Sequence, residues 1–203
     1  MDLVGGNYKI AVVATLAALA AGTGFLAFRV RNAQKGKWYA HMINAPAPAW
    51  MVRDWMHSEP LTLEELRGKI VLVRWWTGPG CPYCTPSAPV LNEIYKDYRG
   101  KGVVVVGFYH HKADDPIDRR QVQKMAESMG MEFPSAIDHG WATLKRYWLD
   151  KAPADSWTSV SFLIDQHGIT RHVHPGGIIT EEDADAIRSE IEALLQITAM
   201  NEQ

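Results

Sequence analysis

Two apolar runs in the middle of the chain flank a segment with helical periodicity. Residues 70–76 form a largely apolar run of strand length, and residues 103–109 are β-branched and almost wholly apolar. Such runs are typical of strands that are covered on both faces of a sheet. Residues 86–98, between them, carry their large apolar side chains at helical spacing. The pattern therefore predicts a strand, a helix and a second strand.

The rest of the chain predicts two helices, two strands and a final helix, at residues 116–130, 141–149, 160–165, 169–174 and 180–197. Gly130 ends the first of these helices, and Gln166-His167-Gly168 forms a tight turn between the two strands. The final helix is amphipathic, with Thr180 as its N-cap and three acidic residues in its first turn. The order of elements predicts an α/β sandwich with a mixed sheet flanked by helices.

A different pattern opens the chain. Residues 10–28 carry no charge, and as a helix they would extend over about 28 Å, close to the hydrocarbon thickness of a bilayer. We expect a membrane anchor. A cleaved signal peptide, with a processing site near Ala18-Leu19-Ala20, fits less well because apolar residues continue beyond it. A buried core helix fits least, since the segment has no polar face.

This anchor gives the expected domain organisation. Five segments follow one another as a tail, a transmembrane anchor, an Ala/Pro-rich linker, one globular domain and a second tail, at residues 1–8, 9–30, 31–48, 49–198 and 199–203. The prolines of the linker favour an extended spacer between bilayer and domain.

The orientation of the anchor is contested by two features. More basic residues follow the apolar segment than precede it, which by the positive-inside rule alone places the domain in the cytoplasm. The chain also carries two closely spaced cysteines, Cys81 and Cys84, and exposed thiols on a membrane tether suit an oxidising compartment better. We therefore expect a single-pass protein of the inner (cytoplasmic) membrane with its domain on the extracytoplasmic, periplasmic side.

Composition narrows the function. The chain has 203 residues, 47 % of them hydrophobic, and a formal net charge of −2, which argues against nucleic acid as the main partner. Its only two cysteines are Cys81 and Cys84. A bridge between them would close a very small loop and would hardly constrain the unfolded chain. The pair therefore indicates chemistry rather than stabilisation.

The position of this pair explains the chemistry. The turn Gly80-Cys81-Pro82-Tyr83-Cys84 comes directly after a predicted strand and directly before a predicted helix. The N-terminus of that helix stabilises a thiolate on Cys81 and makes it a nucleophile at neutral pH. Cys84 then resolves the mixed disulfide. We expect Pro82, in the first helical turn, together with Tyr83 and Gly80 to tune the redox potential.

Half of a zinc site is the alternative use of two such cysteines. Zinc wants four ligands, and the chain has no second Cys-x-x-Cys pair. His110-His111 and His172-x-His174 could complete a site, but we interpret them as strand-end or surface histidines. We therefore expect no metal and no cofactor.

Beyond this physical argument, the chain resembles the TlpA/ResA-type thioredoxin-like proteins of the redoxin and AhpC/TSA-like group. The matching motifs are a Leu-rich lead-in ending in Arg67-Gly-Lys69, the strand at 70–76, Cys81-Pro-Tyr-Cys84, Pro89 and Ser161-Phe-Leu-Ile-Asp-Gln-His-Gly168. The resemblance covers about residues 45–198. It implies a thioredoxin-like fold with an extra N-terminal strand and an inserted helix. It also implies antioxidant disulfide exchange with protein thiols and with a redox partner protein.

Three departures from the family pattern bear on the site. Ser159 stands where relatives have a cis-proline, in the loop Thr158-Ser159-Val160 on which substrate chains dock. A trans bond, or strain, is expected there, because a cis peptide without proline costs about 3 kcal/mol. Arg74 occupies the strand position that is acidic in thioredoxin, where it could lower a thiolate pKa or point to solvent. Residues 77–80 are one residue longer than the usual link.

Two other functions compete with disulfide exchange. A copper chaperone of the Sco type would use two thiolates for Cu(I), but that group places three residues between its cysteines and a histidine before the later strand. This chain has Ser156 and Trp157 there. A thiol peroxidase wants Thr-x-x-Cys, and counting from Thr77 falls one residue short of Cys81. The sequence favours a thiol–disulfide oxidoreductase.

Overall fold

The computed structural model describes residues 37–201. The predicted anchor at 9–30 lies outside these residues. Within them, no helix is both long enough and apolar enough to cross a bilayer.

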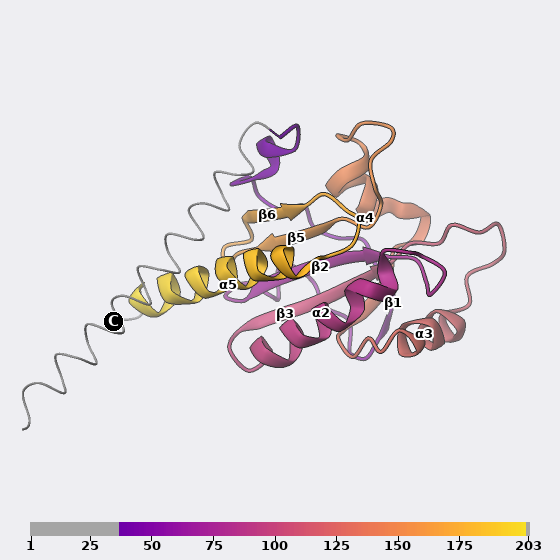
Figure 1. Ribbon diagram of the computed structural model, residues 1–203, viewed down its shortest axis with the longest axis horizontal. Coiled ribbons are helices and arrows are strands. Elements are labelled where there is room, and N and C mark those ends of the chain that lie inside the picture. The colour runs from indigo at the N-terminus through magenta and orange to yellow at the C-terminus, as the bar shows by residue number, and fades with distance from the viewer. Residues whose placement is uncertain (1–36, 202–203) are drawn as a thin grey trace, which may run out of the picture.

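A six-stranded mixed sheet forms the centre of the described residues, with the strand order β1-β4-β3-β2-β5-β6 (Figure 1). Its strands are β1 (Arg53–Met56), β2 (Ile70–Trp76), β3 (Val103–Tyr109), β4 (Ser135–Ile137), β5 (Ser161–Ile164) and β6 (Thr170–His174). Strands β2, β3 and β4 run parallel, whereas β1, β5 and β6 pair antiparallel with their neighbours. The predicted mixed sheet and its flanking helices are confirmed.

Helices cover one face of the sheet. They are α2 (Cys84–Tyr98), α3 (Arg119–Ser128) and α5 (Glu181–Asn201). Alternate residues of β2, namely Ile70, Leu72 and Trp76, pack against them in one core cluster. We call this side the helical face.

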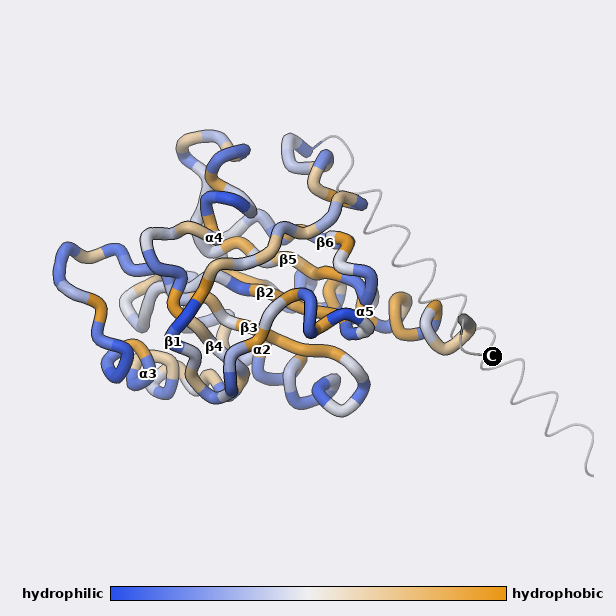
Figure 2. Tube along the Cα trace, turned by 180° about the vertical axis from the view of Figure 1, so that it is seen from behind, coloured by the Kyte–Doolittle hydropathy of each residue, from blue (hydrophilic) through white to orange (hydrophobic). Residues whose placement is uncertain are grey.

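The opposite side of the sheet is rich in aromatic rings. Val71, Val73 and Trp75 of β2 point to it, and they pack with rings that include Phe108, Tyr147, Trp148 and Phe162. We call this side the aromatic face. Figure 2 shows that hydrophobic residues concentrate in the central strands between these two layers, whereas hydrophilic residues gather in α3 and the loop before it.

The segment that covers the aromatic face was predicted as a single helix at 141–149. Instead, a 3₁₀ turn at His139–Trp141, the short helix α4 (Ala142–Leu144) and a π-helical turn at Lys145–Leu149 follow one another. Gly140 and Trp141 have φ angles of 61° and 60°, which a continuous helix cannot contain.

The other predicted helices differ only at their ends. The helix predicted at 116–130 is shorter, because Asp118 caps it by accepting a hydrogen bond from the Arg120 N–H. The final helix begins after Thr180 as expected, where Thr180 and Asp183 cap each other's backbone N–H groups.

Residues ahead of β1 lie on the domain. The Asn44 N–H donates to the Thr170 carbonyl, the Thr170 N–H to the Ala45 carbonyl and the Ala47 N–H to the Gly168 carbonyl. Pro46 thereby forms an isolated antiparallel bridge with Ile169, beside β6. Tyr39 and Met42 are buried in the core of the aromatic face. Residues 37–48 of the predicted linker therefore contact the domain, and the boundaries proposed for the five segments stay a prediction.

Candidate functional site

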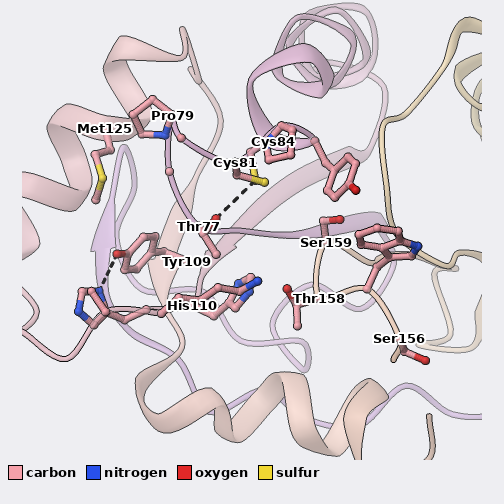
Figure 3. A pocket seen from close by; sticks show the side chains of 18 residues that line it. Thr77, Pro79, Cys81, Cys84, Tyr109, His110, Met125, Ser156, Thr158 and Ser159 are labelled. Atoms are coloured by element: carbon pink, nitrogen blue, oxygen red, sulfur yellow. Dashed lines mark hydrogen bonds between the residues drawn. A yellow bond between two sulfur atoms is a disulfide. The ribbon is translucent and has the colours of Figure 1, made fainter. Parts of the chain in front are cut away.

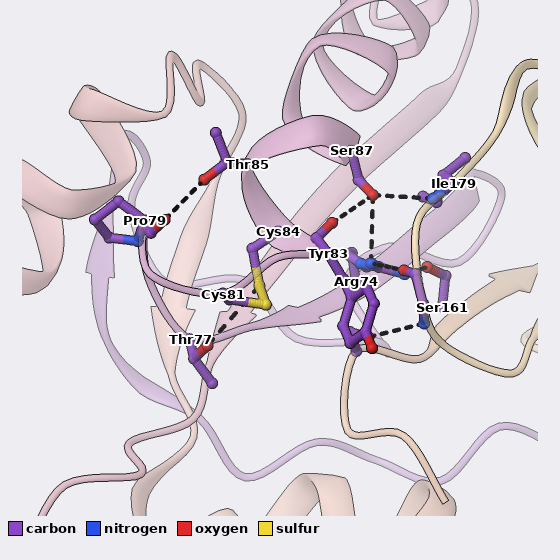
Figure 4. Close-up of a disulfide and its surroundings, with 12 residues drawn as sticks. Arg74, Thr77, Pro79, Cys81, Tyr83, Cys84, Thr85, Ser87, Ser161 and Ile179 are labelled. Atoms are coloured by element: carbon purple, nitrogen blue, oxygen red, sulfur yellow. Dashed lines mark hydrogen bonds between the residues drawn. A yellow bond between two sulfur atoms is a disulfide. The ribbon is translucent and has the colours of Figure 1, made fainter.

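The two cysteines lie where β2 gives way to α2. The loop 77–83 connects the two elements, and Cys84 is the first residue of α2. The sulfurs of Cys81 and Cys84 form a disulfide, with their Cα atoms 5.3 Å apart (Figure 4). Pro82 was expected inside the first helical turn, but it lies two residues ahead of the helix, because Tyr83 is the N-cap.

The two sulfurs differ in exposure. Cys84 is only 2 % exposed and belongs to the core of the helical face, between the helix and the sheet. Cys81 is half-buried and packs against the rim of that core. An incoming thiol can therefore reach Cys81, whereas Cys84 is shielded from it.

A cleft of about 640 Å³ opens beside the disulfide. Its walls come from four parts of the chain: the loop 77–84, the end of β3 with residues 110–113, Met125 of α3 and the loop 156–159. Figure 3 shows Thr158 and Ser159 across the cleft from Pro79 and Met125. Of the predicted site residues, Gly80 to Cys84, Thr158 and Ser159 all line this one cleft.

A hydroxyl group lies beside the buried sulfur. Thr77 Oγ1 is 3.8 Å from Cys84 Sγ, close enough for a weak hydrogen bond to sulfur. Thr77 therefore contacts the second cysteine. The sequence pattern that a peroxidase requires would place this threonine beside the first.

The loop on the far wall is held at several points. The Trp157 carbonyl accepts a hydrogen bond from Trp148 Nε1, at 2.9 Å, and the Val160 carbonyl accepts one from the Trp75 N–H, at 3.1 Å. The Ser159 hydroxyl accepts a hydrogen bond from the Gly177 N–H, at 3.0 Å. The bond between Thr158 and Ser159 is trans, one of the two outcomes expected. Val160 itself is buried and does not line the cleft.

Two aromatic rings meet across the cleft mouth. The rings of Tyr83 and Trp157 lie edge to face with their centroids 4.6 Å apart. Trp157 is nevertheless 52 % exposed, which is unusual for so large an apolar side chain. The pair joins the cysteine loop to the far wall and presents an apolar surface next to Cys81.

Arg74 does not point to solvent. It is 1 % exposed on the helical face, below the first turn of α2, and it does not line the cleft. Its guanidinium donates to the Gly177 carbonyl, at 2.7 Å, and to the hydroxyls of Ser161 and Ser87. The sequence singles out Arg74 but does not reveal this environment, since Gly177 and Ser161 are distant from it in the chain.

His110 was interpreted as a strand-end or surface residue, and its surface placement is wrong. It is 1 % exposed, lines the cleft and packs edge-on against Trp141, 5.2 Å between ring centroids. Neither ring nitrogen has a hydrogen-bond partner among residues 37–201. Burial, and then the charge of Lys112, lower the pKa of His110 to about 3, so the ring is neutral at pH 7. Figure 3 shows it between Tyr109 and Thr158.

Of the other three histidines in that interpretation, His174 ends β6 and His111 follows β3, as expected for strand ends, whereas His172 lies inside β6. His172 and His174 of β6 are buried on the helical face, where β6 pairs with β5 opposite Leu163 and Ser161. His111 lies at the cleft, where it hydrogen-bonds Tyr109 Oη at 2.7 Å. In the part of the chain that is described, no three His, Cys, Asp or Glu side chains are grouped so that they could hold a metal ion.

Comparison with known proteins identifies the same kind of protein. The family model described as Redoxin matches residues 43–188. The chain is 30 % identical over 156 residues to the thiol-disulfide oxidoreductase ResA of Bacillus thuringiensis, covering 77 % of this chain and 81 % of that protein. It is also 30 % identical over 138 residues to the ResA protein of Halalkalibacterium halodurans, covering 66 % of this chain and 72 % of that one.

Solved structures agree on the fold. A protein from Chlorobium tepidum, described as a thiol:disulfide interchange protein DsbE, superimposes with a TM-score of 0.61 at 24 % identity, over 75 % of this chain and 97 % of that one. The likeness confirms a thioredoxin-like fold around the Cys81–Cys84 disulfide.

Proposed function

The chain belongs to the redoxin family, and we propose that Cys81 and Cys84 are the couple through which this thiol–disulfide oxidoreductase exchanges disulfides with protein thiols. The observation that carries the proposal is the unequal exposure of the two sulfurs in a formed disulfide at a helix N-terminus. Cys81 is accessible to a partner, whereas Cys84 is buried next to it.

The exchange runs in two balanced steps. The Cys81 thiolate attacks a substrate disulfide, so that a mixed disulfide forms and one substrate thiolate leaves. The Cys84 thiolate then attacks Cys81 Sγ, which re-forms the internal disulfide and releases the second substrate thiolate. Two electrons pass from the cysteine pair to the substrate, and every step can run in reverse. The N-terminal end of α2 stabilises the anion on Cys81 in either direction.

Residues around the couple have supporting parts in this proposal. Pro82 offers no N–H group and Gly80 no side chain, so the backbone beside Cys81 stays open to a partner. Tyr83, through its contact with Trp157, fixes the loop that carries the couple. Together these three residues set the potential of the couple by shaping its surroundings.

We propose the loop Thr158-Ser159-Val160 as the docking segment for an extended substrate chain. Thr158 makes no hydrogen bond within the described residues, so its peptide groups are available to pair with such a chain. The neighbouring carbonyls of Trp157 and Val160 are already used. A docked chain can therefore form backbone hydrogen bonds with only a short stretch of this loop. The exposed ring of Trp157 supplies apolar contact next to that stretch.

The apolar segment at 10–28 supports a membrane location for this activity. We propose that it anchors the chain in the cytoplasmic membrane with the oxidoreductase domain on the extracytoplasmic side. Added protease should then degrade the domain in spheroplasts with an intact membrane. Protection of the domain until the membrane is lysed would place it in the cytoplasm.

Trapping tests the assignment of the cysteines. A Cys84→Ser variant cannot resolve the first intermediate, so it should accumulate a mixed disulfide with a peptide disulfide, detected as a mass increase at Cys81. The matched control, Cys81→Ser, keeps only the shielded sulfur and should form none. Equal adducts on both variants, or adducts on neither, would contradict the proposed roles.

A further inference from the structure

Arg74 brings a positive charge into the core on the helical face. Its guanidinium lies below the first turn of α2, in the surroundings of the disulfide (Figure 4). It contacts only neutral acceptors: the Gly177 carbonyl and the hydroxyls of Ser161 and Ser87. Its ε N–H has no partner at all among the described residues. The group is therefore both buried and incompletely hydrogen-bonded.

No carboxylate of the described residues contacts this guanidinium. Among residues 37–201, Arg74 forms no ion pair within 4 Å. The acidic group whose field reaches it is Asp183, but that carboxylate accepts hydrogen bonds from Thr180 and lies 3.5 Å from His174 Nε2. Burial lowers the pKa of Arg74 to about 9, and Asp183 opposes the shift, so the guanidinium stays charged at neutral pH. A buried charge of this kind is costly unless something repays it.

The cysteine loop is connected to this guanidinium through Ser87. Ser87 Oγ, which accepts a hydrogen bond from Arg74, donates to the Tyr83 carbonyl at 2.7 Å. Tyr83 lies between the two cysteines, directly before Cys84. Two hydrogen bonds therefore connect the guanidinium to the turn that holds the disulfide. The N-terminal end of α2 adds positive potential at the same place.

The two redox states respond differently to this potential. The disulfide is neutral, whereas the reduced couple carries a thiolate. A positive potential therefore stabilises the reduced state and leaves the oxidised state unchanged. Stabilising the reduced state raises the reduction potential, which makes the disulfide a stronger oxidant. A carboxylate at the Arg74 position would act in the opposite direction.

Resting on the proposed function, we infer that Arg74 poises Cys81–Cys84 as an oxidant, whose substrates are protein dithiols that the chain converts into disulfides. A substrate thiolate attacks Cys81 Sγ, the Cys81–Cys84 bond breaks, and Cys84 leaves as a thiolate and takes up a proton. The second substrate thiol loses its proton and attacks the substrate sulfur of the mixed disulfide, which releases the Cys81 thiolate. A partner protein disulfide of higher potential then reoxidises the couple.

The direct measurement is the equilibrium of the full chain, purified in detergent, with reduced and oxidised glutathione. We expect the wild-type couple to be more oxidising than glutathione. Arg74→Met should shift the equilibrium at least tenfold toward the disulfide, which corresponds to a potential lower by about 30 mV. The alkylation of Cys81 should shift to higher pH in the same variant. Arg74→Lys, which keeps the charge, should stay close to wild type in both the glutathione equilibrium and the pH of Cys81 alkylation.

Two further variants keep the test decisive. Arg171 of β6 is ion-paired with Asp165. Arg171→Met is therefore the matched arginine control, and it should leave the glutathione equilibrium unchanged. If Arg74→Met does not fold, Asp183→Asn gives a test of opposite sign. It removes the acidic field at Arg74 and should make the couple more oxidising.

The outcomes separate the two levels of the proposal. An unchanged equilibrium in Arg74→Met, or a wild-type couple more reducing than glutathione, overturns the oxidant assignment while disulfide exchange still stands. A failure of Cys84→Ser to trap any adduct overturns the proposed function itself.

Discussion

Residues 74 and 75 are neighbours in β2, yet they illustrate two different ways to bury polar chemistry. Trp75 points to the aromatic face, where its Nε1 donates to the buried carboxylate of Asp138 at 3.0 Å. That carboxylate also accepts the N–H groups of Thr143 and Leu144, at 2.9 and 2.7 Å. Arg74, on the helical face, keeps an unpartnered ε N–H and meets no anion among the described residues.

The difference separates structure from chemistry. Asp138 accepts three N–H donors, two of which are backbone groups of Thr143 and Leu144. The carboxylate therefore holds the irregular segment at 139–149 in place. The Arg74 cation lies below the first turn of α2, and its ε N–H has no partner among the described residues. An unsatisfied buried charge is a cost in the folded state that a functional site can use. We therefore expect the contacts of Asp138 to act mainly on stability and the charge of Arg74 to act mainly on redox behaviour.

The largest expected effect is on the aromatic face. Asp138→Ala leaves three buried N–H donors without acceptors, so the free energy of unfolding should fall by about 3–5 kcal/mol. Denaturant titration of the oxidised protein measures it. Asp138→Asn, which keeps one acceptor oxygen, should lose less. A loss below 1 kcal/mol in Asp138→Ala would remove the contrast between the faces.

The second-largest expected effect is a loss of unfolding free energy in acid, caused by a histidine on the helical face. Burial, and then the nearby His174, lower the pKa of His172 from 6.5 to about 4. Between these values the unfolded chain binds a proton that the folded chain excludes, so stability falls as pH drops from 6.5 toward 4. His172 alone should account for about 3 kcal/mol of this loss.

The acid effect has its own control. In His172→Leu the dependence of the unfolding free energy on pH should become flatter over that window, whatever the stability of the variant at pH 7. An unchanged slope would show that other groups cause the acid loss.

The smallest expected effect has the opposite sign. Arg74→Met replaces an uncompensated buried cation by an apolar side chain of similar length, so the unfolding free energy should rise by about 1 kcal/mol. The loss of one donor to the Gly177 carbonyl limits the gain. Thermal unfolding of the oxidised variant beside wild type measures it. A marked loss of stability would mean that Arg74 serves the fold as Asp138 does.

The central strands could be predicted because burial on both faces leaves a continuous apolar run. Strands β2 and β3 begin and end at the predicted residues. Strand β1 lies at an edge with two exposed residues, and β4 has only three residues, so neither has a pattern long enough to recognise. The broken helix near 141 depends on the Asp138 carboxylate, which periodicity does not reveal.

Within the site, local chemistry could be predicted and long-range surroundings could not. The spacing of the two cysteines, together with the strand before them and the helix after them, predicts the redox site. The burial of Arg74 depends on Gly177 and Ser161, which only folding brings to β2. His110 follows an apolar strand and precedes a polar loop, so the pattern alone favours exposure. A packing partner as remote as Trp141 decides otherwise.

The contact of residues 44–47 with the turn before β6 has a consequence for self-association. An open sheet edge offers unpaired backbone groups on which a second molecule can add a strand and start an aggregate. Here Pro46 and its neighbours cover the start of β6 with a stretch that contains prolines, which are poor templates for further pairing. At the opposite edge, β1 is short, bulged and interrupted by Asp54 at φ 56°. Both edges of the sheet therefore resist the addition of further strands.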